Sequence, residues 1–201
     1  KSNHAMFTMK YNYAKAAGTL VFIGAVQFLL GLIIAEALYP DYSISENYIS
    51  DLGVGPSAAI FNSSVFLLGV MIMIGAYFIW REFDSKLFFI FLVLAGFGAV
   101  GVGLFTEDAG TIHGVVSLIA FLFGGLSAIA SYKLQRSPLS YFAVLLGIMT
   151  LVALVLFISG IYLGLDKGGM ERMVAYPVLL WAVGFSSHLI GQSEDTTATT
   201  K

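Results

Sequence analysis

The chain has 201 residues, of which 58% are hydrophobic and 11% are charged, and its formal net charge is −2 at pH 7. Soluble domains carry about 25% charged residues, so this composition excludes an ordinary soluble domain and indicates a membrane protein. The absence of cysteine excludes disulfides and thiolate metal sites, and the absence of a basic patch argues against a nucleic-acid partner.

Six long apolar segments account for most of the chain. The residues before them, 1–5 (Lys-Ser-Asn-His-Ala), look like a cloning scar. A helix needs roughly 20 apolar residues to cross a hydrocarbon core about 30 Å thick. Segments that reach or approach this length are 17–38, 58–80, 87–105, 112–132, 139–163 and 173–190. We therefore expect an all-α bundle of six transmembrane helices in one domain, residues 6–192, and a disordered tail at 193–201.

The loop between the first two spans, residues 39–57, is the longest connection and is rich in polar side chains. It contains two prolines and two glycines. Ordered loops of this length tend to be functional rather than simple linkers. We expect this loop to be ordered and to supply four candidate binding residues, which are Glu46, Asn47, Ser50 and Asp51.

Asn62 begins a formal glycosylation sequon, Asn62-Ser-Ser64, just inside the second span. A glycosylated asparagine needs an exposed loop, so we reject that modification. At the membrane boundary the amide requires a hydrogen-bond partner. The sequence leaves open whether Asn62 bridges helices or belongs to a binding site.

The third span contains the sequence Gly96-Phe-Gly98-Ala-Val-Gly101, which matches the letters of the dinucleotide-binding fingerprint. That fingerprint requires a strand before it and a helix after it, whereas this run lies within an apolar span. Small residues also recur at Ala95, Ala99 and Gly103. Small side chains at a spacing of four let helices approach closely in lipid, so we predict a tightly packed third helix.

Ionisable side chains gather where the third, fourth and sixth spans meet the same membrane boundary. Such residues are costly at membrane depth and are often functional. We expect them to join Asp51 in one polar cluster near the boundary. The candidates contributed by these spans are Glu107, Asp108, His113, Glu171 and Arg172.

Two kinds of chemistry suit this cluster, with Asp51, His113 and Glu171 as the catalytic candidates. Carboxylates and one histidine can hold a divalent metal that activates water, although a single histidine is thin support for zinc. Alternatively, His113 acts as a general base held by Asp51 or Glu107. The structural alternative is that His113 caps a helix and that Glu171 pairs with Arg172. Enzymatic activity and metal dependence therefore stay open.

Basic residues gather on one side of the predicted bundle, because the first and third loops contain none. Short loops rich in Lys and Arg stay in the cytoplasm. The sequence thus predicts a multi-pass protein of the cell membrane with both termini cytoplasmic and the polar cluster facing outward. Lys167 and Arg172, in the fifth loop, are exceptions. The cytoplasmic set is Lys1, Lys10, Lys15, Arg81, Lys86, Lys133, Arg136 and Lys201.

The run Ser45–Pro56, the following Ile60-Phe-Asn62, the acidic loop before His113 and the Glu171-Arg172 pair together resemble the domain-of-unknown-function 998 family of prokaryotic six-span membrane proteins. The segment Tyr48-Ile-Ser-Asp51 is more loosely similar to the damage-regulated autophagy modulator family. The resemblance implies the six-helix topology and no reaction. It marks as motif positions Asn47, Ser50, Asp51, Gly53, Pro56, Asn62, His113 and Glu171.

Three functions remain after this reading. The first is an outward-facing site at headgroup depth that binds or modifies a lipid or another amphiphile. The second is a small transporter or channel, which needs a polar path through the midplane. The third is a non-enzymatic scaffold in which Asp51 locks the first loop. The only polar groups available for a midplane path are Ser117, Ser127, Thr150 and Ser159. Besides the bilayer and such an amphiphile, no partner or oligomeric state is predicted.

Overall fold

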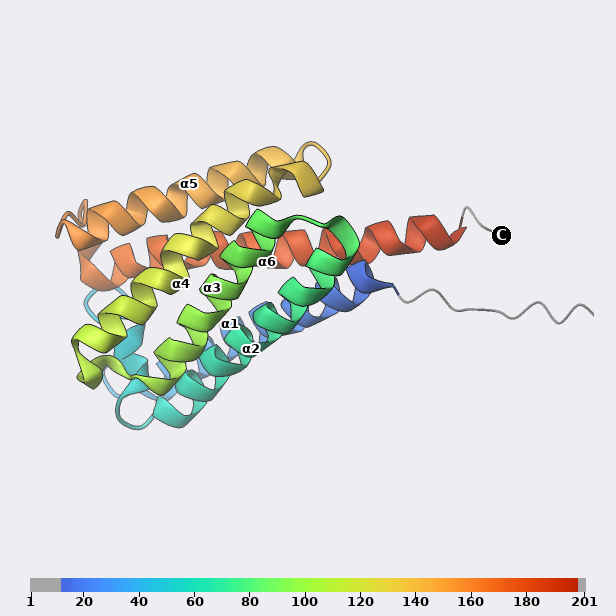
Figure 1. The fold of residues 1–201 in the computed structure, drawn as a ribbon. Coiled ribbons are helices and arrows are strands. Elements are labelled where there is room, and N and C mark those ends of the chain that lie inside the picture. The colour runs from blue at the N-terminus through green and yellow to red at the C-terminus, as the bar shows by residue number, and fades with distance from the viewer. Residues whose placement is uncertain (1–11, 199–201) are drawn as a thin grey trace, which may run out of the picture.

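The computed structural model describes residues 12–198, and all regular elements within that range are helical (Figure 1). Six long helices are each apolar and long enough to span a membrane, which confirms the predicted all-α six-span fold. They are α1 (Tyr13–Leu38), α2 (Ala58–Phe83), α3 (Lys86–Leu104), α4 (Thr111–Ala130), α5 (Leu139–Ile158) and α6 (Asp166–Ala198). Three short 3-10 helices lie between them: η1 (Ser50–Gly53), η2 (Glu107–Ala109) and η3 (Ser131–Leu134). The predicted cloning scar, residues 1–5, lies outside the described residues.

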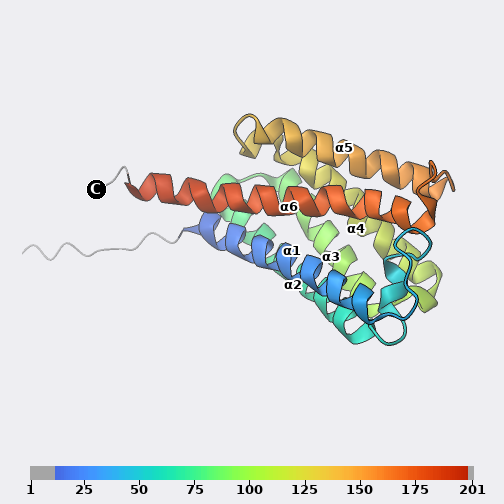
Figure 2. The same cartoon turned by 180° about the vertical axis from the view of Figure 1, so that it is seen from behind.

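The helices form a ring, because each packs on the next along the chain and α6 packs back on α1 (Figures 1 and 2). α4 also contacts α6 directly, which leaves α5 on the outside of the α4–α6 seam. Both ends of the described chain lie at the same end of the bundle, here called the terminal end. The opposite end, called the loop end, carries residues 39–57, here called the cover loop, together with η2 and the start of α6.

Glycines let α3 pack closely against both of its neighbours. A Cβ atom on Gly98 would lie 2.4 Å from the backbone nitrogen of Ala120 on α4. On the other side, a Cβ on Gly103 would lie 2.7 Å from the carbonyl oxygen of Asn62 on α2. Only glycine tolerates such approaches. The run that resembles a dinucleotide fingerprint is therefore a helix-packing surface in the interior of α3.

The structure differs from the sequence prediction at both ends of the last helix. α6 begins at Asp166 rather than at residue 173, so Glu171 and Arg172 lie on the helix and not in a loop before it. The first N–H groups of a helix have no partner within it, and here the Gly168 and Gly169 N–H groups donate to the Ser45 carbonyl of the cover loop. This contact stabilises a helix start that the two glycines disfavour.

The C-terminal end of α6 also extends beyond the predicted boundary. The helix continues to Ala198, whereas we expected a disordered tail from residue 193. No proline or glycine follows Gly191, and propagating an existing helix adds one hydrogen bond for each residue that is fixed. Conversely, α5 ends at Ile158 rather than at residue 163. Gly160 and Gly164 both adopt positive φ angles in the connection that follows.

Aromatic side chains close the ring toward the terminal end. The rings of Trp181 and Phe185 on α6 stack with centroids 5.4 Å apart, and Phe88 of α3 meets Phe185 edge-on at the same separation. The buried indole N–H of Trp181 donates to Ser131 Oγ at 2.9 Å. These contacts form a packed floor below the space between the helices.

Candidate functional site

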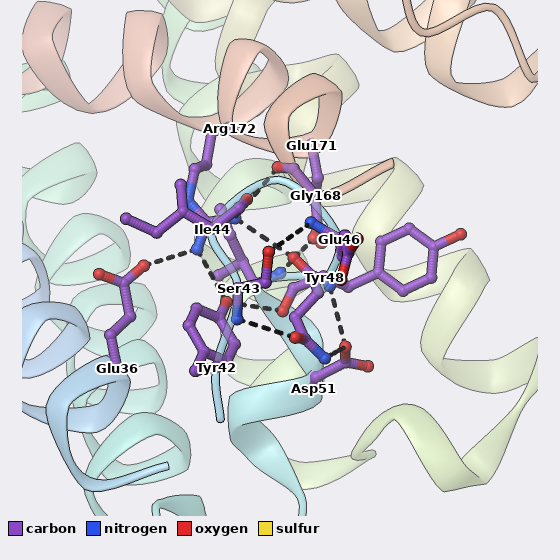
Figure 3. Close-up of polar contacts among 12 residues, drawn as sticks. Glu36, Tyr42, Ser43, Ile44, Glu46, Tyr48, Asp51, Gly168, Glu171 and Arg172 are labelled. Atoms are coloured by element: carbon purple, nitrogen blue, oxygen red, sulfur yellow. Dashed lines mark hydrogen bonds and ion pairs between the residues drawn. The ribbon is translucent and has the colours of Figure 1, made fainter. Parts of the chain in front are cut away.

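Arg172 is the main anchor of the cover loop to the helices (Figure 3). Its guanidinium is buried, and Nη1 donates to the carbonyl oxygens of Ile44 and Asn47 at 2.8 and 3.3 Å. Nη2 donates to Glu36 Oε1 at 2.6 Å and to the Tyr42 hydroxyl at 2.8 Å. One arginine thus joins α6, α1 and the cover loop, which uses the planar fork that lysine lacks.

Glu171, the preceding residue on α6, holds the next part of the cover loop. Its carboxylate accepts a hydrogen bond from the Ile49 backbone N–H. Close backbone contact continues one turn earlier, where a Cβ on Gly168 would lie 2.0 Å from the Asn47 carbonyl oxygen. Glycine is therefore required at position 168. The first turns of α6 and the cover loop form a single packed unit.

Asp51 orders the cover loop from within. Its Oδ2 accepts from the Asn47 side-chain amide at 3.0 Å and from the Tyr48 backbone N–H at 2.9 Å (Figure 3). The same Asn47 side chain accepts from the Ser43 backbone N–H at 3.0 Å. This arrangement explains why a polar run at the membrane boundary has a defined conformation.

Asp51 also forms a hydrogen-bonded carboxyl pair with Glu107 of η2. Burial and the hydrogen bond to Asp51 raise the pKa of Glu107 to about 7. For Asp51, burial acts in the same direction but is outweighed by hydrogen bonds from Glu107, Asn47 and the Tyr48 N–H, which lower its pKa. Two adjacent carboxyl groups resist double ionisation, so this pair holds one proton on the acidic side of neutral pH.

His113, at the start of α4, is held by the backbone, whereas one of the alternatives from the sequence had Asp51 or Glu107 hold it. Its Nδ1 lies 2.8 Å from the Phe105 carbonyl oxygen, which can only accept, so Nδ1 carries the proton. Nε2 is then an acceptor, and Ser117 Oγ lies 3.2 Å from it. The histidine therefore fastens the turn between α3 and α4, and its Nε2 accepts from the Ser117 hydroxyl, which a stronger donor would have to replace.

An apolar cavity of about 110 Å³ lies between α1, α2, α3, α4 and α6. Its walls are almost entirely aliphatic and aromatic, and Trp181 and Ala182 are the lining residues of α6 that lie furthest from the start of that helix. The polar residues of its lining are Ser50, His113, Ser117 and Glu171.

A second space, of about 300 Å³ and here called the mouth, lies between the cover loop, α4, α5 and α6. Glu107 and Tyr48 line it on the polar side, and Phe157 and Ile158 of α5 line it on the apolar side. The cavity and the mouth share five lining residues, which are Ser50, His113, Ser117, Phe121 and Glu171.

Four of the predicted site residues line the mouth, namely Ser50, Glu107, His113 and Glu171, and all of them except Glu107 also line the cavity. The remaining candidates line neither space. Asn47, Asp51 and Arg172 lie behind them and hold the cover loop. Asn62 donates to the Gly53 carbonyl at 2.9 Å, which fastens the end of the loop to α2. Glu46 and Asp108 are exposed.

Glu36 and Tyr42 are parts of the site that the sequence reasoning overlooked. The structural alternative paired Arg172 with Glu171, but the ion pair is with Glu36, which closes the far side of the network. Burial raises the pKa of Tyr42 to about 12 despite the neighbouring guanidinium. A carboxylate inside an apolar span demands a cation, so Glu36 itself was a signal that Arg172 would turn toward α1.

The part of the chain that the structure describes contains no set of side chains arranged as metal ligands. Residues 12–192 contain no group of three or more His, Asp or Glu side chains placed to hold a metal ion. The divalent metal considered from the sequence therefore has no geometry here to support it. What the junction offers is a set of hydrogen-bond acceptors beside an apolar cavity.

Comparison with known proteins identifies a family without identifying an activity. No curated protein and no solved structure matches the chain significantly, so the looser similarity to the autophagy modulator family stays untested. One family model does match, over residues 22–188, which extends from within α1 to within α6. The chain therefore belongs to the family described as protein of unknown function DUF998.

Proposed function

We propose that this integral membrane protein binds an amphiphile at the loop end, with the polar head in the mouth and an apolar segment in the cavity. The observation that carries the proposal is the shared lining of the two spaces at Ser50, His113 and Glu171. The mouth places Glu107 beside that junction, whereas beyond the junction the cavity is lined by hydrocarbon side chains. An amphiphile has the same division along its length.

The lining of the cavity favours a hydrocarbon occupant. Its lining includes Phe28, Leu68 and Leu92, and apolar cavities of this kind stay dry and accept apolar molecules. Its volume of about 110 Å³ accommodates only part of a ligand. The mouth, at about 300 Å³, reaches the lower limit of ordinary ligand sites, which begin at about 300 Å³. The two spaces together suit one alkyl chain better than a bulky lipid.

The position of the mouth favours loading from the bilayer. Leu118 of α4 and Ile158 of α5 line it and are 41% and 66% exposed on the outer surface of the bundle. In a membrane such surfaces face hydrocarbon. An amphiphile can therefore move sideways between α4 and α5 without its chain crossing water.

Photo-crosslinking with the protein in lipid nanodiscs tests this proposal. The probe is dodecylamine carrying a diazirine at the end of its alkyl chain, with peptide mapping of the products. We expect crosslinks to cavity residues of α4 and α6, and at least a fivefold loss in Ala95→Leu, which fills the cavity. Ala59→Leu, on an exposed position of α2, is the matched control and should change nothing. Crosslinks confined to the lipid-facing surface, or unaffected by Ala95→Leu, would refute the site.

If the protein were a transporter, a conducting path would have to continue from the junction toward the terminal end. Ser127 and Thr150 are fully buried but line neither described space. Liposomes containing the protein should therefore show no flux of monovalent ions above protein-free liposomes. Flux that is abolished by Ala95→Leu would favour transport over simple binding.

A further inference from the structure

We infer that the head of the bound amphiphile is a primary ammonium group, which enters the mouth and is held by Glu107, Glu171 and the Nε2 edge of His113. This inference rests on the proposed function and specifies its ligand. It excludes anionic heads such as phosphate, sulfate or carboxylate from the same position. The argument comes from the charges and hydrogen-bonding groups around the junction.

The charged groups that line the cavity and the mouth are acidic. Among the described lining residues, Glu107 and Glu171 are the only Asp, Glu, Lys or Arg. Two carboxyl groups facing a partly desolvated space repel an anion and stabilise a cation. A bound ammonium would supply the counter-charge that the lining lacks.

The hydrogen-bonding groups point to the same head group. Glu171 has one hydrogen bond among the described residues, from the Ile49 N–H, which leaves acceptor capacity facing the junction. His113 Nε2 is an acceptor because Nδ1 donates to Phe105, and an ammonium would replace the Ser117 hydroxyl that lies 3.2 Å from it. Glu107 adds a carboxyl group at the mouth. A primary ammonium carries three N–H donors and no acceptor, so it complements a set of three acceptors.

The two cations nearest the mouth do not offer an anion site inside it. Arg172 directs both of its terminal nitrogens to Glu36, Tyr42 and backbone carbonyls on the far side of α6. Lys167 places Nζ 4.4 Å from the centre of the Tyr48 ring and lines neither space. Its charge still lowers the pKa of Glu107, so its contribution must be tested directly.

Binding of an ammonium group in the mouth is expected to release a proton from Glu107. Because burial and Asp51 raise the pKa of Glu107 to about 7, this carboxyl is partly protonated near neutral pH when the mouth holds no cation. An arriving ammonium favours the ionised form and releases the proton. Affinity for an alkylamine should therefore rise as the pH increases through about 7.

A series of probes with one alkyl chain and different heads tests the inference. Dodecylamine, dodecyltrimethylammonium, dodecanol and dodecanoate compete with the photoreactive dodecylamine for the protein in nanodiscs of neutral lipid. We expect dodecylamine to compete best, by about tenfold over the trimethylammonium compound, which has the charge without the donors. Dodecanoate should compete least. Equal or better competition by dodecanoate would overturn the inference while leaving the binding site in place.

Three variants assign the effect to particular groups. Glu107→Gln and Glu171→Gln preserve shape and should each weaken dodecylamine competition about tenfold without weakening dodecanol. Asp108→Asn, an exposed neighbour outside the mouth, is the control. Lys167→Gln should leave dodecylamine binding equal or stronger. Loss of binding only in Lys167→Gln would mean that an anion is the true ligand and would also overturn the inference. Failure of every probe to compete would instead refute the proposed function.

Discussion

Arg172 and Glu171 are neighbours in sequence but serve opposite sides of the cover loop. Arg172 turns toward α1, where Glu36 neutralises it, and Nη1 donates to the backbone carbonyls of Ile44, Asn47 and Gly168. Its Nε has no hydrogen-bond partner among the described residues. Glu171 turns toward the junction and binds one backbone N–H. A buried charge without partners is strongly destabilising, which accounts for the partners that surround both terminal nitrogens of Arg172. Glu171 keeps unused acceptor capacity and is therefore the better candidate for ligand contact.

The carboxyl pair of Asp51 and Glu107 makes stability depend on pH from two directions. Because the pKa of Glu107 is raised in the folded protein, its contribution to the stability of the fold is complete below pH 4.5 and is lost as the pH rises through about 7. Because the pKa of Asp51 is lowered in the folded protein, its contribution to the stability of the fold is present above pH 3.8 and is lost as the pH falls through the lowered pKa. The charge of Lys167 lowers the pKa of Glu107 and so opposes its upward shift. Glu171 is the other acid that interacts with Asp51 and Glu107.

We therefore expect the thermal unfolding midpoint of the apo protein to be highest at mildly acidic pH and to decline as the pH passes about 7. Glu107→Gln should flatten the decline, because an amide can still donate to Asp51 but does not ionise. Asp108→Asn should retain the wild-type profile. Differential scanning fluorimetry in a nonionic detergent provides the measurement. A decline of the same size in Glu107→Gln would assign the pH dependence to another group.

The positions of Glu107, His113 and Glu171 show how much of the site could be predicted from the sequence. The apolar spans placed Glu107, His113 and Glu171 at one end of the bundle, because span ends alternate between two boundaries. Their hydrogen-bond partners were not predictable from the sequence, since contacts between different helices depend on how each helix is rotated about its axis. Thus His113 bonds the Phe105 carbonyl rather than an acid, and Arg172 pairs with Glu36 across the ring.

The start of α6 and the cover loop depend on each other. Gly168 and Gly169 look like loop residues in the sequence because glycine disfavours helices. In the structure their N–H groups bond the Ser45 carbonyl, and the helix begins earlier than the apolar pattern indicated. Periodicity and composition describe one element at a time, so they did not reveal a helix start that a distant loop stabilises.

Gly168→Ala should release the cover loop. The added Cβ would meet the Asn47 carbonyl oxygen at 2.0 Å, and relieving that clash requires the loop to move. We expect faster hydrogen exchange in the backbone around Asn47 and Ile49, and a loss of stability of about 1–3 kcal/mol. Gly114→Ala on α4 is the matched control, because nothing lies within 4 Å of its Cβ, and it should be neutral or stabilising. Unchanged exchange in Gly168→Ala would show that the loop is not held there.

The bundle as a unit has a defined polarity, with the cover loop at one end and both described chain ends at the other. Six apolar segments of sufficient length made this topology predictable from hydropathy alone, because each must cross a membrane once. The cavity was not predictable. Its walls come from five helices, so its shape depends on how their side chains pack across the bundle.

The distribution of Lys and Arg predicts that the loop end faces out of the cell. The absence of cysteine allows a clean test with two single-cysteine variants, Glu46→Cys at the loop end and Glu82→Cys at the terminal end. Both positions are exposed. A membrane-impermeant maleimide should label intact cells only through Glu46→Cys, with Glu82→Cys labelled after permeabilisation. The reverse pattern would place the amphiphile site in the cytoplasmic half of the membrane.

The long-range anchoring of the cover loop has a consequence for biogenesis. The loop is synthesised early, but Glu171 and Arg172, which hold it, leave the ribosome more than a hundred residues later. Until the last span inserts, Glu36 has no arginine to pair with and the loop has no helix start to bind. We therefore expect the cover loop to reach its final conformation only after α6 has inserted and packed against α1.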